Sequence, residues 1–580
     1  MLFSKNTLKT LKGYDTPPYL ENFLMKLDTN ENILGPSPKV IEAIRNITEE
    51  EIKFYPAYGE LVEELAIFNK LTSKQVLPTN GCDEALNYIF DTFMSPDDEV
   101  ITVKPSFAMP KIYANAIGCV YNELDYDEKW VFPTEKLINK ITPQTKLIIL
   151  TTPNNPTGDA ISRENVLKIL EKSKHCYVLI DETYTHYTEE SFTDLIEEYP
   201  NVIITKSFSK DFALAGLRVG YILAVPEIIN EIKKIICPFS VNTIAVKAAL
   251  AALRDKEYFE KIKKEVITSR NLLYNGLKSL AKTVYDGKAN FLVADFADKA
   301  DFYYTRLLNA GIKIKNFAGH PELNGCLRIS IPTIEQTKII LDILNEERAL
   351  LVFDIDGVIV DTRQSYRMAI KNTFEYFANK SIDFSEIQEA KNLGGLNNDW
   401  DLTEYLLKNE GLNIDKNIII DKFQEFYIGS DFNGLILNES ILIQPEKLNE
   451  LSKEYDMAVF TGRPKDEAEF VLKRWNLYNI FSNIITMDDI PLEKGKPDSF
   501  GLEVIKSKTV NKEILYFGDT SDDMISAVGA KVKGIGILPP QDKTQELTDK
   551  MLEKGAFAVL QETDEIVDFL GAKHYEMQRS

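Results

Sequence analysis

Short apolar runs, rich in β-branched residues, recur along this chain, and each of them ends in polar residues or in proline and glycine. Runs of this kind are typical of strands that are buried on both faces of a parallel sheet, with functional loops at the strand ends. The stretches between them have helical periodicity. We therefore predict an α/β protein. The runs are 100–103, 146–150, 177–180, 202–204, 350–353, 457–460 and 514–517.

The chain changes character near residue 347. Glu335 to Arg348 has the pattern of a helix and passes almost directly into the run 350–353, without a Gly, Ser or Pro linker. A chain of 580 residues is expected to hold three or four folding units. We expect one domain over 1–346, whose smaller part comes from the N-terminal segment and about 250–346. A second domain is expected over 347–580, with a helical insertion at about 363–450.

Composition excludes several classes of protein. The net charge of −22 repels nucleic acid and anionic membranes, so neither is expected as a partner. No apolar run approaches the ~20 residues that span a bilayer. The first ten residues lack an apolar core, which argues against a secretory signal. The five cysteines are scattered without metal spacing, which favours reduced thiols and a cytoplasmic location.

Charged and polar residues stand at the ends of several predicted strands in the first domain. Lys210 comes after a strand and two serines, with Arg218 eight residues on, and Asp181 closes the preceding strand. The loop 152–158 closes the strand before that, and residues 79–84 are suited to open a helix whose amides bind phosphate. Singly, each is an ordinary turn or helix cap. Together they predict a pyridoxal phosphate (PLP) site, which needs a lysine, an acid for the ring nitrogen and donors for phosphate.

Four further motifs give this region a family resemblance. They are residues 27–32 (Leu-Asp-Thr-Asn-Glu-Asn), 35–38 (Gly-Pro-Ser-Pro), 213–218 (Ala-Leu-Ala-Gly-Leu-Arg) and 326–329 (Cys-Leu-Arg-Ile). With these motifs, residues 20–345 resemble a fold-type I aminotransferase of the histidinol-phosphate aminotransferase family. The resemblance implies the PLP-dependent transferase fold, with a large α/β domain and a small α+β domain.

The resemblance also implies roles for individual residues. Lys210 forms the Schiff base and moves the proton, and Asp181 pairs with the ring nitrogen. Tyr55 reaches the cofactor of a neighbouring subunit, which implies a homodimer. The remaining implied contacts are Asn155 and Tyr184 at the ring hydroxyl, Phe107 on the ring face, Cys82, Asp83, Ser207, Ser209 and Arg218 at the phosphate, and Arg328 with Lys315 at the substrate's anionic group.

Two of these positions depart from the family pattern. Phe107 stands where the family usually has tyrosine, and Lys315 stands where it usually has arginine. Arginine binds a carboxylate or phosphate with two parallel hydrogen bonds and lysine does not. The identity of the amino acceptor therefore stays open.

The second domain opens with two aspartates directly after a strand. Asp354 and Asp356 are two residues apart, so strand alternation turns them to the same side. A lone pair of this kind is more often a solvated loop. Four later residues change that interpretation, because they supply a hydroxyl, a cation and two more carboxylates at strand or loop ends: Thr461, Lys496, Asp519 and Asp523. Attack of a carboxylate on phosphorus needs such a set, with Mg²⁺ to screen the charges.

In this order the motifs resemble the haloacid dehalogenase (HAD) superfamily of phosphatases over residues 349–570. The resemblance implies that Asp354 is the nucleophile and Asp356 the acid and base, with Thr461 and Lys496 at the phosphoryl group. It also implies that Asp354, the Asp356 carbonyl and Asp519 hold Mg²⁺, with Asp523 in support. The insertion 363–450 resembles the helical cap of the first HAD subclass. Within it, residues 391–400 either face substrate or form an ordinary Gly-Gly turn.

We expect a bifunctional enzyme that uses glutamate to aminate a small phosphorylated ketone and then removes the phosphate. The family resemblance favours imidazole acetol phosphate, then histidinol phosphate, then histidinol, as in histidine biosynthesis. Dihydroxyacetone phosphate, giving serinol phosphate and serinol for surface polysaccharide, is an alternative. Two other hypotheses stay open. In one, the HAD domain is a binding or assembly module without catalytic activity. In the other, the first domain is a PLP decarboxylase on the same fold.

Overall fold

A computed structural model describes residues 23–577 except 128–129, 189 and 393–398, together with 6–9, 11 and 13. The chain divides into two compact units. Unit 1 comprises Met1–Ala300 and Ala310–Asn345, and unit 2 comprises Asp301–Asn309 and Glu346–Ser580. Helix α12 (Ala300–Asn309) therefore falls almost wholly in unit 2. The domain boundary at residues 346 and 347 stays a prediction.

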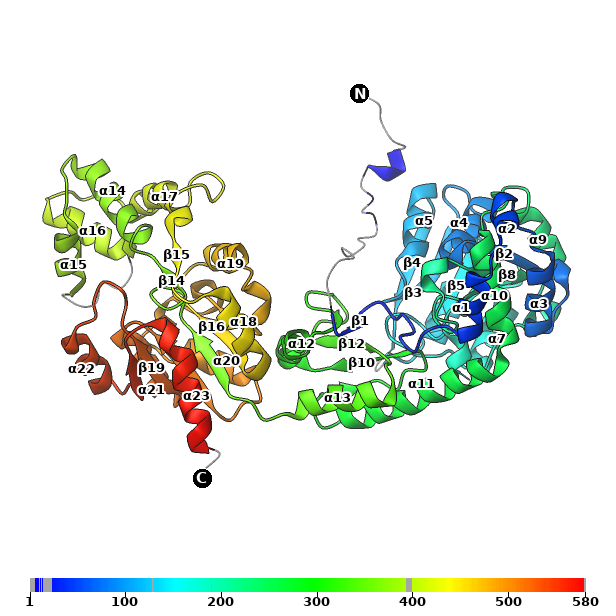
Figure 1. Ribbon diagram of the computed structural model, residues 1–580. Coiled ribbons are helices and arrows are strands. Elements are labelled where there is room, and N and C mark those ends of the chain that lie inside the picture. The colour runs from blue at the N-terminus through cyan, green and yellow to red at the C-terminus, as the bar shows by residue number, and fades with distance from the viewer. Residues whose placement is uncertain are drawn as a thin grey trace. The chain divides into compact units, whose positions relative to one another are not determined.

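Unit 1 is built on a seven-stranded sheet (Figure 1). Five of its strands, β7, β6, β5, β3 and β4, lie next to one another and are parallel. Strand β8 runs antiparallel to both of its neighbours, β2 and β7. The order across the sheet is β2 (Val76–Thr79), β8 (Gly220–Ala224), β7 (Val202–Ser207), β6 (Tyr177–Asp181), β5 (Thr145–Thr151), β3 (Glu99–Lys104) and β4 (Val120–Asp125).

Both faces of this sheet are buried, and the sequence of each strand shows why. Ile148 and Leu150 enter one apolar cluster, while Leu147 and Ile149 on the same strand enter another. Alternate residues of a strand point to opposite faces, so a continuous apolar run serves two cores. The helices of unit 1 are α1 (Pro38–Arg45), α2 (Glu49–Lys53), α3 (Gly59–Asn69), α4 (Gly81–Phe93), α5 (Met109–Ile117), α6 (Thr134–Lys140), α7 (Arg163–Lys172), α8 (Leu195–Glu198), α9 (Pro226–Ile232), α10 (Thr243–Arg254), α11 (Lys256–Leu277) and α13 (Ile334–Asn345).

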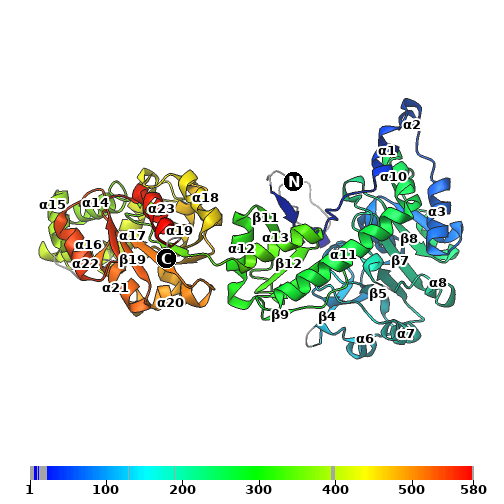
Figure 2. The same cartoon turned by 60° about the horizontal axis from the view of Figure 1, so that its bottom comes forward.

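A smaller sheet completes unit 1. Its order is β1 (Met25–Leu27), β11 (Ile312–Asn316), β12 (Cys326–Ser330), β10 (Phe291–Asp295) and β9 (Thr283–Val284). Helices α11 and α13 lie side by side next to it (Figure 2). The N-terminal strand β1 thus joins a sheet made mainly of residues after 280, and the assignment of these parts to one small subdomain stays a prediction.

Unit 2 contains a six-stranded sheet in which all strands are parallel. Leu351 and Phe353 enter one apolar cluster, and Leu350 and Val352 enter another, so this sheet too is buried on both faces. The order is β17 (Asn483–Ile485), β16 (Asp456–Phe460), β13 (Leu350–Phe353), β18 (Ile514–Gly518), β19 (Lys533–Ile537) and β20 (Ala558–Leu560). The helices packed with it are α18 (Pro445–Glu454), α19 (Lys465–Arg474), α20 (Phe500–Ser507), α21 (Ser521–Ala530), α22 (Gln545–Glu553) and α23 (Ile566–Met577).

A helical insertion, which is the segment predicted to be the cap and is called the cap below, interrupts unit 2 between β13 and β16. It consists of α14 (Tyr366–Ala378), α15 (Phe384–Asn392), α16 (Asp399–Asn409) and α17 (Lys416–Tyr427). Two short antiparallel strands, β14 (Val360–Asp361) and β15 (Ser440–Ile441), join it to the sheet (Figure 1). Of the cap segment 391–400, residues 393–398 lie outside the described residues, and Asp399 and Trp400 begin α16.

The predicted fold class is confirmed, and each predicted apolar run coincides with a strand of the two large sheets. The helical pattern of 335–348 corresponds to α13, which ends at Asn345, and four residues separate it from the next strand, which begins at Leu350. None of the helices in the described part of the chain combines the length and hydropathy of a membrane-crossing segment.

Candidate active sites

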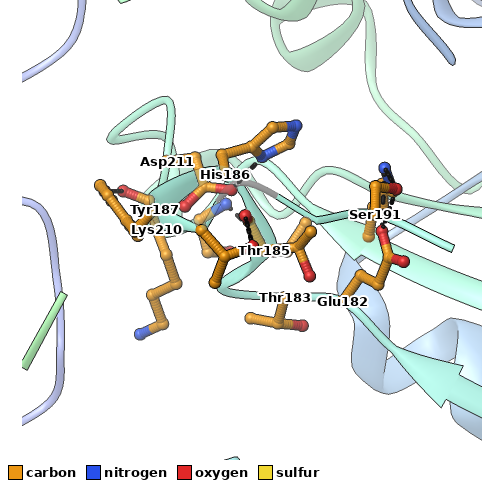
Figure 3. A network of polar contacts seen from close by, with 12 residues as sticks. Glu182, Thr183, Thr185, His186, Tyr187, Ser191, Lys210 and Asp211 are labelled. Carbon is orange, nitrogen blue, oxygen red and sulfur yellow. Dashed lines mark hydrogen bonds and ion pairs between the residues drawn. The ribbon is translucent and has the colours of Figure 1, made fainter. Parts of the chain in front are cut away.

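Lys210 lies just after β7, at the end of the sheet where the parallel strands of unit 1 finish (Figure 3). Its Nζ donates a hydrogen bond to the Thr29 carbonyl oxygen at 2.8 Å. Burial lowers the pKa of the Lys210 ammonium to about 8, with Glu31 opposing the shift. About a tenth of the amine is therefore in its neutral, nucleophilic form at pH 7, far more than for an ordinary lysine.

Asp181 ends the neighbouring strand β6. All its hydrogen bonds fall on Oδ1, which accepts from Thr183 N at 3.1 Å, Thr183 Oγ1 at 2.7 Å and Thr205 Oγ1 at 3.2 Å. Among the described residues, no hydrogen bond falls on Oδ2. Burial raises the pKa of the Asp181 carboxyl. A protonated ring nitrogen placed at Oδ2 would supply the charge partner that favours the carboxylate.

The predicted hydroxyl-binding and substrate-binding residues are connected. Arg328 on β12 donates from Nη1 to Asn155 Oδ1 at 2.6 Å and from Nη2 to the Asp28 carbonyl oxygen at 2.6 Å. Tyr184 OH accepts from Asn30 Nδ2 at 3.2 Å. The Arg328 guanidinium also lies 5.3 Å from the centre of the Phe291 ring, which orients it further.

The phosphate end of the predicted site lies where α4 begins at Gly81. Arg218 Nη2 pairs with Asp83 Oδ2 at 2.7 Å, and Ser209 N donates to Ser207 Oγ at 3.0 Å. A Cβ on Gly81 would come within 2.6 Å of Arg218 Nη2, so only glycine lets the guanidinium approach the helix N-terminus. Because the Arg218 and Asp83 side chains are nearly half exposed, their pair is weak and can yield to a phosphate dianion.

For four of the predicted cofactor and substrate contacts, the structure gives the position of the residue but does not test the predicted role. Cys82 Sγ donates to the Lys206 carbonyl oxygen at 3.0 Å, and Phe107 packs against the apolar cluster around α4 and α5. Lys315 is exposed and stands opposite Arg328 in the β11–β12 register. Tyr55 is 79% exposed and stacks on Phe239 with ring centroids 4.5 Å apart. Their roles stay predictions.

Sequence reasoning missed the buried charges behind this site. Glu182 and Lys206 form a fully buried ion pair at 3.0 Å, and Ser191 Oγ donates to Glu182 Oε2 at 2.7 Å (Figure 3). His186 Nδ1 pairs with Asp211 Oδ2 beside Lys210. Glu182 directly follows Asp181, so strand alternation turns its side chain away from the site. This alternation is the sequence signal that could have predicted a buried carboxylate there.

Asp354 of unit 2 lies just beyond β13 and is buried. Its Oδ2 pairs with Lys496 Nζ at 2.9 Å, and the same ammonium lies 2.8 Å from Asp523 Oδ1. Burial raises the pKa of the Asp354 carboxyl, against the opposing effect of Lys496. The predicted nucleophile, cation and supporting carboxylate therefore lie together at one end of the sheet.

Three carboxylates form a group suited to a cation. Asp354, Asp519 and Asp523 each offer an oxygen within 4.8 Å of the others. Asp523 is already engaged, because Oδ1 accepts from Tyr516 OH at 2.6 Å and Oδ2 from Thr520 Oγ1 at 2.7 Å. Asp354 and Asp519 as ligands for a hard divalent cation, with Asp523 in support, stay a prediction that this grouping fits.

Asp356 and Thr461 meet at an arginine that the sequence left without a role. Asp356 Oδ1 accepts from Arg463 Nε at 2.7 Å, and Thr461 Oγ1 accepts from Arg463 N at 3.3 Å. Arg463 also contacts Glu439, which precedes the cap strand β15. No local sequence pattern predicts a role for Glu439, because its partner Arg463 is 24 residues away in the chain.

The two sites define two classes of protein. A lysine and an acid at adjacent strand ends, beside a helix N-terminus with an arginine, are the groups of a PLP-dependent transferase. A nucleophilic aspartate with lysine and paired carboxylates is the set of a carboxylate-dependent phosphohydrolase.

The chain belongs to the class I and II aminotransferase family, whose model matches residues 23–344. A second model, of haloacid dehalogenase-like hydrolases, matches residues 351–537. The chain is therefore a bifunctional enzyme, with an aminotransferase part that uses PLP and a phosphatase part. The unbroken Asp354, Lys496 and Asp519 set is at odds with a HAD domain that only binds.

Similar proteins match the first part. The histidinol-phosphate aminotransferase of Methanocaldococcus jannaschii is 35% identical over 332 residues, which is 56% of this chain and 89% of that protein. The histidinol-phosphate aminotransferase structure from Clostridium acetobutylicum is 26% identical with a TM-score of 0.51, covering 55% and 98% of the two chains. An aspartate aminotransferase mutant from Thermus thermophilus is 25% identical with a TM-score of 0.51, covering 59% and 99%.

Proposed function

We propose that the chain transfers an amino group from glutamate to a phosphorylated ketone and then hydrolyses the phosphate ester of the amino product. One observation carries this proposal: both predicted sets of catalytic residues occur on a single chain, each gathered at the strand ends of its own sheet. The product of the first reaction, an amino alkyl phosphate, is the kind of substrate that the second requires. Because similar proteins are named histidinol-phosphate aminotransferases, we assign imidazole acetol phosphate, histidinol phosphate and histidinol as the ketone, intermediate and product.

In the first reaction PLP, when bound, supplies an electron sink for the bond that breaks at the substrate's α-carbon. Asp181 would hold the ring nitrogen protonated, and Asn155 and Tyr184 would bind the ring hydroxyl. Lys210 would supply the amine that carries the cofactor and would move the proton, since burial lowers the pKa of its ammonium to about 8. Arg328 binds the carboxylate of glutamate.

In the second reaction Asp354 attacks phosphorus, and Asp356 protonates the leaving oxygen and later activates water. Lys496 and Thr461 bind the phosphoryl oxygens. Asp354 and Asp519, with the Asp356 carbonyl and with Asp523 in support, would hold Mg²⁺, which screens the repulsion between the carboxylate and the phosphate.

A smaller ketone, dihydroxyacetone phosphate, is the second candidate substrate. It is favoured by Lys315, which is exposed where the family's arginine would make a paired anion contact. Products would then be serinol phosphate and serinol.

The aminotransferase part is proposed to form a homodimer around Tyr55. Ile52, Phe54, Tyr55 and Phe239 are 65%, 59%, 79% and 48% exposed, and the Tyr55 and Phe239 rings stack. Large apolar side chains gathered on a surface in this way indicate an interface. The location is proposed to be cytoplasmic.

The test is a coupled assay with glutamate, Mg²⁺ and each ketone phosphate in turn, in which both 2-oxoglutarate and phosphate are measured. We expect equal amounts of the two products with imidazole acetol phosphate. Preference for dihydroxyacetone phosphate would select the second candidate. Release of CO₂ from amino acids without 2-oxoglutarate would contradict transamination and indicate a decarboxylase.

A further inference from the structure

We propose that Arg463 is a positioning residue that fixes Asp356, the acid and base of the phosphatase, and ties it to the base of the cap. The inference rests on the role of Asp356 in the proposed function. Arg463 directly follows Gly462 in the loop after β16, so the end of that strand positions it. Its side chain reaches both the loop after β13 and the segment that returns from the cap.

The contacts of Arg463 divide between two carboxylates. Nε and Nη2 lie 2.7 Å and 2.5 Å from Asp356 Oδ1. On the other side, Nη2 lies 3.0 Å from Glu439 Oε1 and Nη1 lies 3.1 Å from Glu439 Oε2. The side chains of Arg463 and Glu439 are fully buried, whereas that of Asp356 is 35% exposed. The guanidinium therefore links a buried anchor to a partly open carboxylate.

Glu439 is itself fixed by the two ends of the cap. Its Oε1 accepts from Ser365 Oγ at 2.9 Å, just before α14, and from Tyr427 OH at 2.9 Å, at the end of α17. Tyr427 OH also accepts from Arg463 Nη1 at 3.1 Å. The ring of Tyr366 lies 5.1 Å from the Arg463 guanidinium. These residues flank β14 and β15, so the network lies where the cap joins the sheet.

The geometry leaves one oxygen of Asp356 for chemistry. Both contacts from Arg463 fall on Oδ1, and among the described residues no hydrogen bond falls on Oδ2. Because Nε and Nη2 approach the same oxygen, they fix the rotation of the carboxyl and point Oδ2 away from the guanidinium. A general acid must be within hydrogen-bond reach of the leaving oxygen, so this orientation sets how well it protonates that oxygen.

Lysine cannot take over this task. A guanidinium presents several donors in one plane and can bind two carboxylates at once, whereas an ammonium is a single point of charge on a flexible stem. Arg463→Lys would keep the charge and lose the paired geometry. Glu439→Gln would keep the shape and weaken the anchor. Both variants should impair the orientation of Asp356 without removing any group that touches phosphorus.

The test compares two leaving groups in single-turnover experiments with the full-length enzyme in excess and Mg²⁺ present. p-Nitrophenol leaves without needing a proton, whereas the alcohol of histidinol phosphate needs one. For Arg463→Lys we expect leaving-group release from histidinol phosphate to slow by about 100-fold, as for loss of general acid catalysis, and from p-nitrophenyl phosphate by less than about 3-fold. Glu439→Gln should show the same selectivity with a smaller loss.

Arg474→Lys is the matched control. Arg474 donates to the carbonyl oxygens of Ile436 and Leu437, so it holds the same returning segment of the cap without contacting Asp356. It should leave both rates close to wild type. The rate with p-nitrophenyl phosphate reports that unit 2 of each variant is folded, because that reaction uses the same nucleophile and needs no proton on the leaving group.

Two outcomes separate this inference from the proposed function. If Asp356→Asn shows the leaving-group selectivity and both Arg463→Lys and Glu439→Gln slow the two esters equally or not at all, Arg463 is structural and the inference is overturned. If Asp356→Asn itself lacks the selectivity, Asp356 is not the acid, and the proposed mechanism fails with the inference.

Discussion

Burial of Lys210 should destabilise the cofactor-free aminotransferase unit in a pH-dependent way. The pKa of Lys210 falls from the usual 10.5 to about 8 in the folded chain because the ammonium is buried. The unfolded chain therefore binds the proton more tightly between pH 8 and 10.5, and stability rises with pH across that window. At about 1.4 kcal/mol per pH unit, the charged amine costs about 3 kcal/mol at pH 7 and about 1 kcal/mol at pH 10.

Lys210→Met removes the charge and keeps a similar length. Its stability advantage over the wild-type chain should shrink by about 2 kcal/mol between pH 7 and pH 10, since other titrating groups cancel in the comparison. The lost hydrogen bond to Thr29 adds an offset that does not vary with pH.

The assay is urea unfolding of both cofactor-free proteins, followed by the fluorescence of Trp130. Trp130 is the tryptophan of unit 1, with its ring between Tyr126 and Tyr285, and Trp400 and Trp475 of unit 2 are replaced by phenylalanine in both proteins. A difference between the two proteins that stays constant from pH 7 to pH 10 would refute a burial-lowered pKa for Lys210.

Three further outcomes are expected. Lys210→Ala should lose transamination and the visible absorbance of bound cofactor while phosphatase activity survives; substantial residual transamination would reject the assignment. Arg328→Ala should lower kcat/KM for glutamate by roughly 30- to several-thousand-fold, because loss of a buried charge partner costs about 2–5 kcal/mol; unchanged efficiency would exclude Arg328 as the anion anchor. The chain should sediment as a dimer, and Tyr55→Ala should weaken cofactor binding; a fully active monomer at micromolar concentration would contradict the interface.

Much of the fold and of the two sites could be predicted because the signals are local. Apolar runs ending in polar residues located the strands, and parallel strands that end together bring Asp181 and Lys210 into one site. The same reasoning placed Asp354 at the carboxyl end of a strand, which is β13. The contact between Asp354 and Lys496 was expected from the order of the motifs in the HAD superfamily and not from their spacing in the sequence.

The remaining contacts join residues that no periodicity links. Asn30 binds Tyr184 across 154 residues, and Asn155 binds Arg328 across 173. Arg463 lies two residues after the predicted Thr461, but its contacts depend on Glu439, which lies in the segment that follows the cap helices. Such pairs are set by the packing of separate elements, so the sequence shows the residue types without showing which of them meet.

The most direct test of the account is a comparison of products from wild-type and Asp354→Asn enzyme, each given imidazole acetol phosphate, glutamate and Mg²⁺. The amide cannot attack phosphorus and is a poorer ligand for Mg²⁺. We expect wild type to accumulate the dephosphorylated amine, and the variant to form 2-oxoglutarate at the same rate while accumulating the phosphorylated amine. Release of phosphate by the variant at the wild-type rate, or by wild type after removal of Mg²⁺ with EDTA, would contradict it.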